Sequence, residues 1–322
     1  MGAVMVTGAA GFIGSHLCEA LLTRGERVAA VDNFDPYYDP QQKRRNISTS
    51  LKNPDFHFHE VDVRDVTAID TIVRSDGVDR IVHLAALAGV RSSIERASDY
   101  VQVNVSGTCN VLEAARRSVV AQVVVASTSS VYGASSELPF VETDSADRPL
   151  APYPATKRAA EVLAHSYCNM HSMNVTVVRL FSVYGPRGRP DMMPYRLVQS
   201  MLLGNEVTMF EGGQMWRDWT YVTDIVDGLI AALDIPQSYK IYNLGRGESV
   251  LMTEFAACLE QLSGRQLLVR NSSAPASEPI STCADIDAAR EHLGYNPKVP
   301  FQEGLARFWE WSVAQSKLGI DK

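Results

Sequence analysis

Hydrophobic positions in the first half of the chain follow two alternating periods. Runs rich in β-branched residues predict buried strands at 3–7, 27–32, 56–61, 80–85, 121–126 and 175–181. Between these runs, apolar residues recur at helical spacing, as Ile13, Leu17 and Leu21 do. Alternating strands and helices predict an α/β fold with a doubly wound parallel sheet. Since such sheets bind ligands beyond the carboxyl ends of their strands, we expect functional residues directly after each strand.

The pattern changes after about residue 182. Later segments predict helices at 192–203, 223–234 and 300–316, a strand at 207–210, and a loop rich in Ser and Pro at 271–282. Thr223 is a candidate N-cap for the second of these helices. We therefore expect a cofactor domain over residues 1–181, to which residues of about 219–246 return, and a smaller C-terminal substrate-binding lobe over 182–322.

Composition and charge narrow the classes of protein. The 322 residues are 46% hydrophobic, and 30 Lys and Arg against 37 Asp and Glu give a net charge of −7. An acidic chain disfavours a nucleic-acid partner, and we interpret the run Lys43–Arg45 as a solvated loop. No apolar stretch reaches the roughly 18 residues of a membrane span, and the first residues predict a strand rather than a signal peptide. We expect no membrane contact and a cytoplasmic location.

Cysteine and histidine spacing argues against disulfides and metals. The five cysteines contain no CxxC pair, so we expect small buried thiols in a reducing compartment. The seven histidines show no ligand spacing; His57 and His59 alternate along one strand, and we interpret His83 as a core residue with satisfied hydrogen bonds. We predict no metal site.

A glycine-rich turn follows the first strand. Gly8, Gly11 and Gly14 permit a tight turn and close approach of the backbone to a pyrophosphate at a helix N-terminus, as in Rossmann-type domains. Asp32 ends the second strand, where its carboxylate accepts from ribose hydroxyls and repels a 2′-phosphate, which favours NAD over NADP. Asp62, after the third strand, is a candidate acceptor for the adenine amino group.

A hydroxyl cluster and a Tyr–Lys pair supply candidate chemistry. Ser127, Thr128, Ser129 and Ser130 follow the fifth strand, and Tyr153 and Lys157 lie one helical turn apart. A phenol with a pKa near ~10 is a poor base at neutral pH. We expect the Lys157 ammonium and a positive nicotinamide ring to lower the pKa of Tyr153 toward the working range.

Seven motifs in this order resemble one family. They are GAAGFIG (8–14), DNF (32–34), HLAA (83–86), STSSVYG (127–133), YxxxK (153–157), RxFxVYGP (179–186) and RDWTYV (217–222). The sequence resembles the extended short-chain dehydrogenases/reductases of the NAD-dependent nucleotide-sugar epimerase/dehydratase family. The resemblance implies that Thr128 bridges the substrate O4 and Tyr153, that Tyr153 is the general base and acid, and that Lys157 holds the nicotinamide ribose.

The resemblance also implies the contacts to the cofactor. The predicted NAD contacts are Gly8, Gly11, Phe12, Ile13, Gly14, Asp32, Asn33, Asp62, Val63, Leu84, Ala85, Ala86, Asn104, Ser127, Tyr153, Lys157, Phe181 and Val183.

Residues 129 and 130 distinguish members of the family. Its dehydratases typically carry Asp-Glu there and its UDP-glucuronate decarboxylases carry Glu at the second position, whereas this chain has Ser129 and Ser130. The segment 187–192 (RGRPDM) resembles UDP-glucuronate 4-epimerases, as do 89–93, 31–40 and 278–294. Arg187 and Arg189 remain open between a sugar contact and a solvated loop.

The implied activity is C4 epimerisation of UDP-glucuronate to UDP-galacturonate through a 4-keto intermediate, an isomerase reaction without net redox change. The intermediate is a β-keto acid, and several hydroxyl hydrogen bonds of ~0.5–1.5 kcal/mol each are needed to hold its carboxylate away from the geometry for decarboxylation. The predicted substrate contacts are Arg91, Thr128, Ser129, Ser130, Tyr153, Ser182, Arg189, Arg196, Thr208, Phe210, Arg217 and Glu278.

Three other functions stay open at this point. A UDP-glucose or UDP-N-acetylhexosamine 4-epimerase would use the same Thr128, Tyr153 and Lys157 on a C6 alcohol. A UDP-glucuronate decarboxylase would be expected to carry Glu at Ser130. An NAD-sensing binding protein would need no Tyr–Lys pair. Relatives commonly form homodimers through two long helices, here predicted at 94–117 and 153–172.

Overall fold

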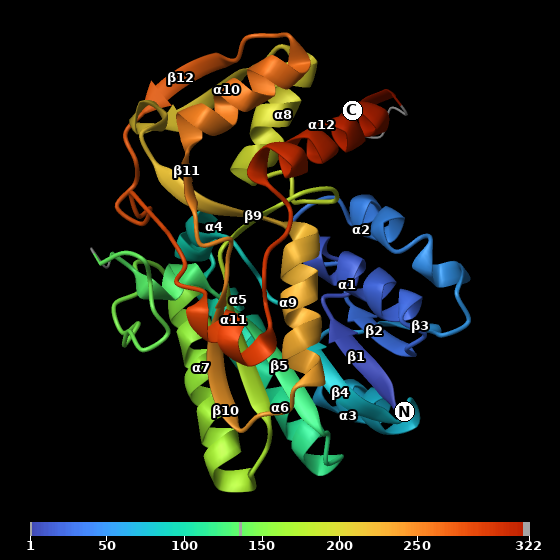
Figure 1. Cartoon of the computed structure of the whole chain (residues 1–322). Coiled ribbons are helices and arrows are strands. Elements are labelled where there is room, and N and C mark those ends of the chain that lie inside the picture. The colour runs from blue at the N-terminus through green and yellow to red at the C-terminus, as the bar shows by residue number, and fades with distance from the viewer. Residues whose placement is uncertain (1, 135–136, 318–322) are drawn as a thin grey trace.

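The computed structural model describes residues 2–134 and 137–317, and a seven-stranded parallel sheet lies at its centre (Figure 1). The strand order is β10-β6-β5-β4-β1-β2-β3. Their bounds are β1 Ala3–Thr7, β2 Val28–Asp32, β3 Phe56–Glu60, β4 Val78–His83, β5 Gln122–Thr128, β6 Val175–Leu180 and β10 Tyr239–Leu244. The predicted doubly wound α/β fold is therefore confirmed.

The strand register brings the carboxyl ends of the central strands to one edge. Thr7 pairs with Val31 on one side and with His83 on the other. Strand order reverses beside β1, because β2 and β3 lie to one side of it and β4, β5 and β6 to the other. In doubly wound sheets such a reversal opens a crevice for ligands, so the fold places a binding site after β1 and β4.

Helices cover both faces of the sheet. On one face, Leu17 and Leu21 of α1 share a core with Leu229 of α9, and on the other Ile69 of α3 shares one with Leu112 of α6. Helix bounds are α1 Phe12–Thr23, α2 Pro40–Asn46, α3 Val66–Ser75, α4 Val90–Glu95, α5 Ala97–Tyr100, α6 Gly107–Arg117, α7 Pro152–His171, α8 Met193–Leu203, α9 Val222–Asp234, α10 Met252–Ser263, α11 Asp287–Leu293 and α12 Phe301–Lys317.

Smaller elements stand above the carboxyl edge of the sheet (Figure 1). A three-stranded sheet joins β7 (Ser182–Tyr184), β9 (Trp216–Tyr221) and β11 (Ser249–Leu251), and a two-stranded one joins β8 (Glu206–Phe210) and β12 (Leu268–Ser272). Helices α8, α10 and α12 pack with them. The start of the predicted loop at 271–282 is thus a strand end, because β12 pairs along β8 as far as Ser272.

Segments from the second half of the chain also pack on the sheet. Strand β10 pairs with β6, α9 packs on β4, β5 and β6, and α11 packs on β10 and α9. Helix α9 begins at Val222 with Tyr221 at the N-cap position, so the predicted cap at Thr223 is wrong and this residue lies in the first turn. The division into residues 1–181 and 182–322 stays a prediction.

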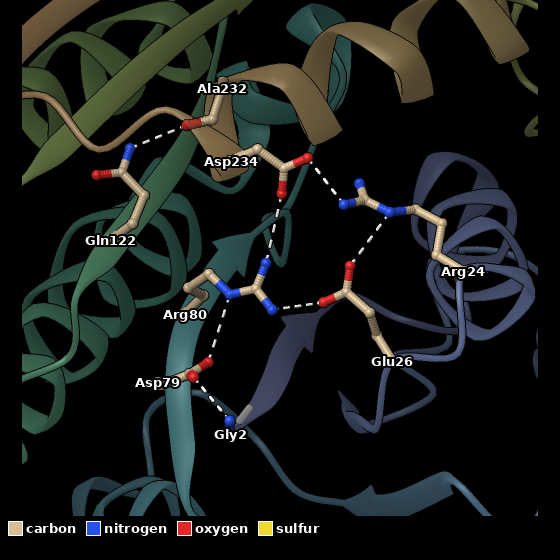
Figure 2. A network of polar contacts seen from close by, with 8 residues as sticks. All are labelled: Gly2, Arg24, Glu26, Asp79, Arg80, Gln122, Ala232 and Asp234. Atoms are coloured by element: carbon tan, nitrogen blue, oxygen red, sulfur yellow. Dashed lines mark hydrogen bonds and ion pairs between the residues drawn. The ribbon is translucent and has the colours of Figure 1, made fainter.

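An ionic network at the amino ends of the strands fixes α9 to the sheet. Figure 2 shows Arg80 of β4 between three carboxylates, those of Glu26, Asp79 and Asp234. Asp234 is the last residue of α9, and Arg24 also pairs with it at 2.8 Å. Carboxylates from the loop between α1 and β2, from β4 and from the end of α9 therefore converge on one mostly buried guanidinium, on the side of the sheet away from the ligand crevice.

Candidate active site

A cavity of about 410 Å³ opens at the carboxyl edge of the sheet, beside β1 and β4. The predicted cofactor residues that line it are Gly8, Gly11, Phe12, Ile13, Gly14, Asp32, Asn33, Asp62, Val63, Leu84, Ala85, Ala86, Ser127, Tyr153, Lys157, Phe181 and Val183. Most of these residues come from the ends of the central strands or the turns after them, as the sheet topology requires.

The glycine turn after β1 is shaped by close backbone packing. Gly8 has a φ of +70°, and a Cβ on it would lie 2.9 Å from the backbone nitrogen of Ala85. A Cβ on Gly14 would lie 2.1 Å from the Gly8 carbonyl oxygen, so a side chain at either position would displace backbone. Helix α1 then begins at Phe12 without a side-chain cap or an acidic residue in its first turn. Its first amides are left for an anionic ligand such as a pyrophosphate.

Asp32 is buried at the end of β2 and is held by its own turn. Its Oδ2 accepts from the backbone N–H of Ala10 at 3.1 Å and its Oδ1 from that of Phe34 at 2.8 Å. Burial raises the pKa of Asp32, while the Lys43 ammonium, 3.9 Å away, and the two amides oppose that rise. The carboxylate is thereby fixed at the cavity wall, where NAD-type recognition of a ribose requires it.

Lys43 corrects the interpretation of 43–45 as a solvated loop. The segment lies in helix α2, whose N-cap is Asp39, and the Lys43 side chain is buried at the cavity against the ring of Tyr38. Arg44 lies over Phe34. Sequence reasoning does not find Lys43 and Tyr38 as cavity residues, because a basic run on a short helix does not reveal which side chain faces inward.

Asp62 is held as an ionised acceptor on the same wall. Arg64 donates to both of its oxygens, at 2.9 and 2.7 Å, and Asn33 donates to Oδ2 at 2.9 Å. These hydrogen bonds, that from Arg64 above all, lower the pKa of Asp62 to about 2 despite partial burial. A carboxylate in this state accepts hydrogen bonds, as recognition of an adenine amino group needs.

His83 lies beneath the cavity floor with both ring nitrogens bonded. Its Nδ1 lies 2.7 Å from the Thr7 hydroxyl and its Nε2 lies 3.0 Å from that of Thr108. Burial, followed by the nearby Lys157 charge, lowers the pKa of His83 to about 3. The interpretation as a satisfied core residue is confirmed, and within residues 2–134 and 137–317 no cluster of side chains suited to a metal ion occurs.

Tyr153 and Lys157 project from the first turns of α7 into the cavity that Thr128 also lines. Burial raises the pKa of Tyr153, whereas its hydrogen bond with Thr128 and the charge of Arg189 lower it. Thr128 and Arg189 therefore oppose the effect of burial on the pKa of Tyr153, and the lowering expected from Lys157 stays a prediction. Burial lowers the pKa of Lys157 to about 8, and Glu161 opposes that change.

Glu161 supports the pair from one turn below. It is fully buried, accepts from the Ser127 hydroxyl, and binds Arg179 through both oxygens at 3.1 and 2.9 Å. Arg158 adds a further contact at 2.9 Å. Because these donors compensate for the burial of its charge, Glu161 ties the Ser127 hydroxyl of β5 to helix α7.

Asn104 does not line the cavity, and its predicted cofactor contact stays a prediction. The predicted helix at 94–117 is divided into α4, α5, a π-helical turn at Val101–Ser106, and α6, and Asn104 lies in that turn. Its side chain accepts from the Leu87 N–H at 2.8 Å and donates to the Leu87 carbonyl and to Thr156 Oγ1, each at 3.0 Å. It therefore ties the loop after β4 to the helix that carries Tyr153.

The sugar end of the site is lined by hydroxyls and arginines. Ser129, Ser130 and Ser182 border both the main cavity and a second one of about 180 Å³, which Arg217 and Glu278 also line. Glu278 bridges two arginines, with contacts of 3.2 Å to Arg217 and 3.4 Å to Arg91. Arg91 in turn lies over the ring of Phe210 at 4.7 Å.

The two arginines of the 187–192 segment have separate places. Arg189 lines the main cavity with Tyr153, whereas Arg187 pairs with Glu19 of α1 at 2.8 Å and does not line either cavity. Four predicted substrate residues also lie outside both cavity walls. They are Arg91 on α4, Arg196 on α8, Phe210 on β8, and Thr208 on β8, which accepts from Arg270 at 3.0 Å.

The cavity fits a dinucleotide from one end to the other. The glycine turn and the free helix amides suit a pyrophosphate, Asp32 and Asp62 suit an adenosine, and Tyr153 and Lys157 stand at the opposite end. In the described part of the chain no helix is long and apolar enough to cross a membrane. Fold and site together are those of a Rossmann-type enzyme with a nicotinamide-dinucleotide cavity, which Tyr153 and Lys157 line.

The chain belongs to the NAD dependent epimerase/dehydratase family, whose model matches residues 4–245. NAD is therefore its cofactor. The UDP-glucuronate 4-epimerase of Thermodesulfobacterium geofontis is 38% identical over 319 residues, which cover 99% of this chain and 98% of that protein.

Solved structures agree in fold over nearly the whole chain. The UDP-glucuronic acid 4-epimerase of Bacillus cereus, in complex with UDP-glucuronic acid and NAD, has a TM-score of 0.91 at 34% identity, covering 97% of this chain and 99% of that one. DesIV, a dTDP-glucose 4,6-dehydratase from Streptomyces venezuelae, reaches 0.92 at 29% identity with 98% of each chain covered. Because an epimerase and a dehydratase superpose equally well, the fold alone does not separate their reactions.

Proposed function

We propose that this chain is a UDP-glucuronate 4-epimerase, which interconverts UDP-glucuronate and UDP-galacturonate without net oxidation. The observation that carries the proposal is the set of neutral hydroxyls that line the cavity with Tyr153, together with the Arg189 guanidinium. Ser129 and Ser130 stand where a dehydratase needs an acid and a base, and Arg189 supplies the positive charge that a substrate carboxylate needs. The names of the Thermodesulfobacterium and Bacillus relatives support the same activity.

The residues around C4 move and hold one proton. NAD bound beside Tyr153 and Lys157 would supply a reversible acceptor for the hydride at C4 of the sugar. Tyr153 would take the proton of the 4-hydroxyl while C4 is oxidised and return it while C4 is reduced on its other face. Thr128 bonds Tyr153 and orients its oxygen. Lys157, with its pKa near 8, is mostly charged at neutral pH and favours the tyrosinate form.

The pocket must also retain the carboxylate. The 4-keto sugar is a β-keto acid, and it loses CO₂ only when the C5–carboxylate bond aligns with the carbonyl π system. Hydrogen bonds from Ser129, Ser130 and Ser182 would hold the carboxylate out of this alignment. Charged acceptors strengthen each such bond to about 1.5–3 kcal/mol, so three suffice to bias the orientation strongly.

A homodimer and a cytoplasmic location complete the proposal. Val101, which directly follows α5, and Val162 and Met170 on α7, leave 49%, 54% and 71% of their surface exposed, which suits contact between copies of the chain. Sedimentation of the purified chain should give twice the monomer mass, and a Val162→Glu variant should give the monomer mass. All five cysteines are free thiols, as a reducing compartment favours.

Product analysis tests the activity. Purified protein is incubated separately with UDP-glucuronate and with UDP-glucose, without added reductant, and the products are separated. The proposal predicts UDP-galacturonate from the first and at least about tenfold slower turnover of the second, which lacks the carboxylate and so forgoes charge-assisted hydrogen bonds of about 1.5–3 kcal/mol each. Preferential epimerisation of UDP-glucose, or a mainly pentose product, would contradict it.

A further inference from the structure

The segment Asp35–Asn46 touches both ends of the active site. Tyr38 and Lys43 line the cofactor cavity beside Asp32. From the same segment, Gln42 donates to the Gly188 carbonyl oxygen at 3.0 Å, which lies next to Arg189. A segment that follows the cofactor strand β2 therefore reaches the loop that carries the arginine of the sugar end.

Tyr37 and Asp191 together hold the Arg189 guanidinium. Asp191 accepts from Nε at 3.0 Å and from Nη2 at 2.8 Å, a two-point contact that fixes the plane of the group. The Tyr37 hydroxyl donates to Asp191 at 3.1 Å, and the Arg189 guanidinium lies over the Tyr37 ring at 5.4 Å. The Asp191 and Tyr37 side chains thus fix the direction in which the Arg189 guanidinium points.

Tyr37 is itself held by Ser92, which also bonds Tyr100. Ser92 Oγ lies 3.3 Å from the Tyr37 hydroxyl and 2.6 Å from that of Tyr100, whose ring meets the Tyr153 ring edge-on at 6.2 Å. Gly89, with a φ of +120°, leaves room for this contact, because a Cβ there would lie 2.9 Å from the Tyr37 oxygen. Neighbouring residues therefore define the position of the Tyr37 hydroxyl.

We propose that Tyr37 and Asp191 are positioning residues that hold Arg189 against the substrate carboxylate and so suppress loss of CO₂ from the 4-keto intermediate. The inference rests on the proposed function. It adds two residues that lie outside the walls of both cavities and that act through Arg189.

The chemistry explains why the position of the charge matters. In decarboxylation the C5–carboxylate bond breaks, CO₂ leaves, and the bonding pair moves into an enolate over C5, C4 and O4, which then takes a proton at C5. The negative charge moves from the carboxylate to the enolate oxygen during this step. A guanidinium held at the carboxylate stabilises the starting charge more than the departing one, and therefore slows the step. A guanidinium that is no longer held at the carboxylate loses this preference for the starting charge.

The test compares products rather than rates. Tyr37→Phe removes only the hydroxyl and keeps the ring beneath Arg189, and Asp191→Asn weakens the two-point contact. Each variant is incubated with UDP-glucuronate to equal total conversion, and UDP-pentose and UDP-galacturonate are quantified. We expect the ratio of pentose to epimer to rise about tenfold or more in both, which corresponds to about 1.4 kcal/mol between the two barriers.

Arg187→Ala is the matched control, since Arg187 lies on the same loop but pairs with Glu19 away from the cavity. Its product ratio should equal that of the unaltered chain. Thermal midpoints and bound NAD confirm that each variant is folded. Unaltered ratios in both Tyr37→Phe and Asp191→Asn, with or without slower turnover, would overturn the inference alone. Failure of the unaltered chain to form UDP-galacturonate would instead overturn the proposed function, and the inference with it.

Discussion

At the scale of single residues, the proposed reaction depends on the Tyr153 phenol, which is buried among groups with opposite effects on its pKa. Burial disfavours the charged form of Tyr153, while Thr128 and Arg189 favour it. We therefore expect Tyr153 to stay protonated in the resting protein. The positive charges of the bound cofactor and of Lys157 are needed to ionise it.

Tyr153→Phe should therefore abolish proton transfer while leaving the fold intact. We expect kcat for UDP-glucuronate to fall about 10²–10⁴-fold, since that is the usual contribution of a positioned general base. The thermal midpoint should change little, because the ring and its contact with Tyr100 remain. Turnover close to that of the unaltered chain would show that another group accepts the proton.

His83 should make stability depend on pH in a defined window. Its pKa is about 3 in the folded protein and 6.5 when unfolded, so below pH 6.5 the unfolded state takes up a proton that the folded state refuses. Stability is full above pH 6.5 and falls as the pH drops toward 3. Between about pH 7 and about pH 5 the loss from this group is about 2 kcal/mol. Urea unfolding should show a pH dependence that is smaller by this amount in His83→Gln; equal dependence in both proteins would refute the assignment.

The residues that sequence can identify are those with local requirements. A tight turn needs glycine at Gly8, and the predicted ribose contact needs a carboxylate at the end of the second strand, where Asp32 lies. Position along the chain is therefore informative in both cases. The sequence interpretation of 43–45 as a solvated loop is wrong, and the contacts of Asn104 are not foreseen, because both depend on which face of a helix turns inward. That orientation is set by tertiary packing, which no local pattern encodes.

At the scale of elements, the π-helical turn at Val101–Ser106 connects the loop after β4 with α7. An extra residue in one helical turn rotates the later residues about the helix axis, and here Asn104 points toward Leu87 and Thr156. A single helix is nevertheless predicted at 94–117, because the apolar positions on either side of the turn are too few to show this change of phase.

Asn104→Ala should loosen that connection. The variant leaves the N–H and carbonyl of buried Leu87 without their side-chain partner, which costs about 1–3 kcal/mol of unfolding free energy. We expect KM for UDP-glucuronate and kcat to worsen together as the loop after β4 and the start of α7 separate. Asn174→Ala is the control, since its side chain makes one exposed bond to the Ala121 carbonyl. Equal stability of the two variants would contradict this role.

At the scale of the whole molecule, sequence predicts the parallel strands and crossing helices in order, but not every segment that joins the sheet. The β-branched runs locate the strands up to residue 181 within a few positions. Helix α11 beside β10 is outside the reach of sequence patterns, since a short polar helix carries no signal of its distant neighbour. The positions of the segments that are predicted to bind the sugar likewise depend on long-range strand pairing, such as that of β7 with β9.

Substitution of Arg80 tests whether the ionic network in Figure 2 stabilises the packing of the second half of the chain on the first. Arg80→Met leaves the carboxylate of Glu26, which is 9% exposed, and that of Asp234 without this cation. Because Asp234 is partly solvated, we expect a loss of about 1–3 kcal/mol rather than the full cost of a buried charge. Arg148→Met, at a highly exposed site, should stay within about 0.5 kcal/mol in urea unfolding. A loss as small in Arg80→Met would mean that the network does not stabilise the packing of α9.

The central claim is that hydride leaves C4 and returns to the same carbon within one turnover. The most direct measurement uses UDP-glucuronate carrying deuterium at C4, incubated with the purified protein in ordinary water, followed by mass and NMR analysis of the UDP-galacturonate formed. The account predicts that the product keeps its deuterium at C4, with the configuration inverted. Loss of the label to solvent, or a labelled pentose as the main product, would contradict it.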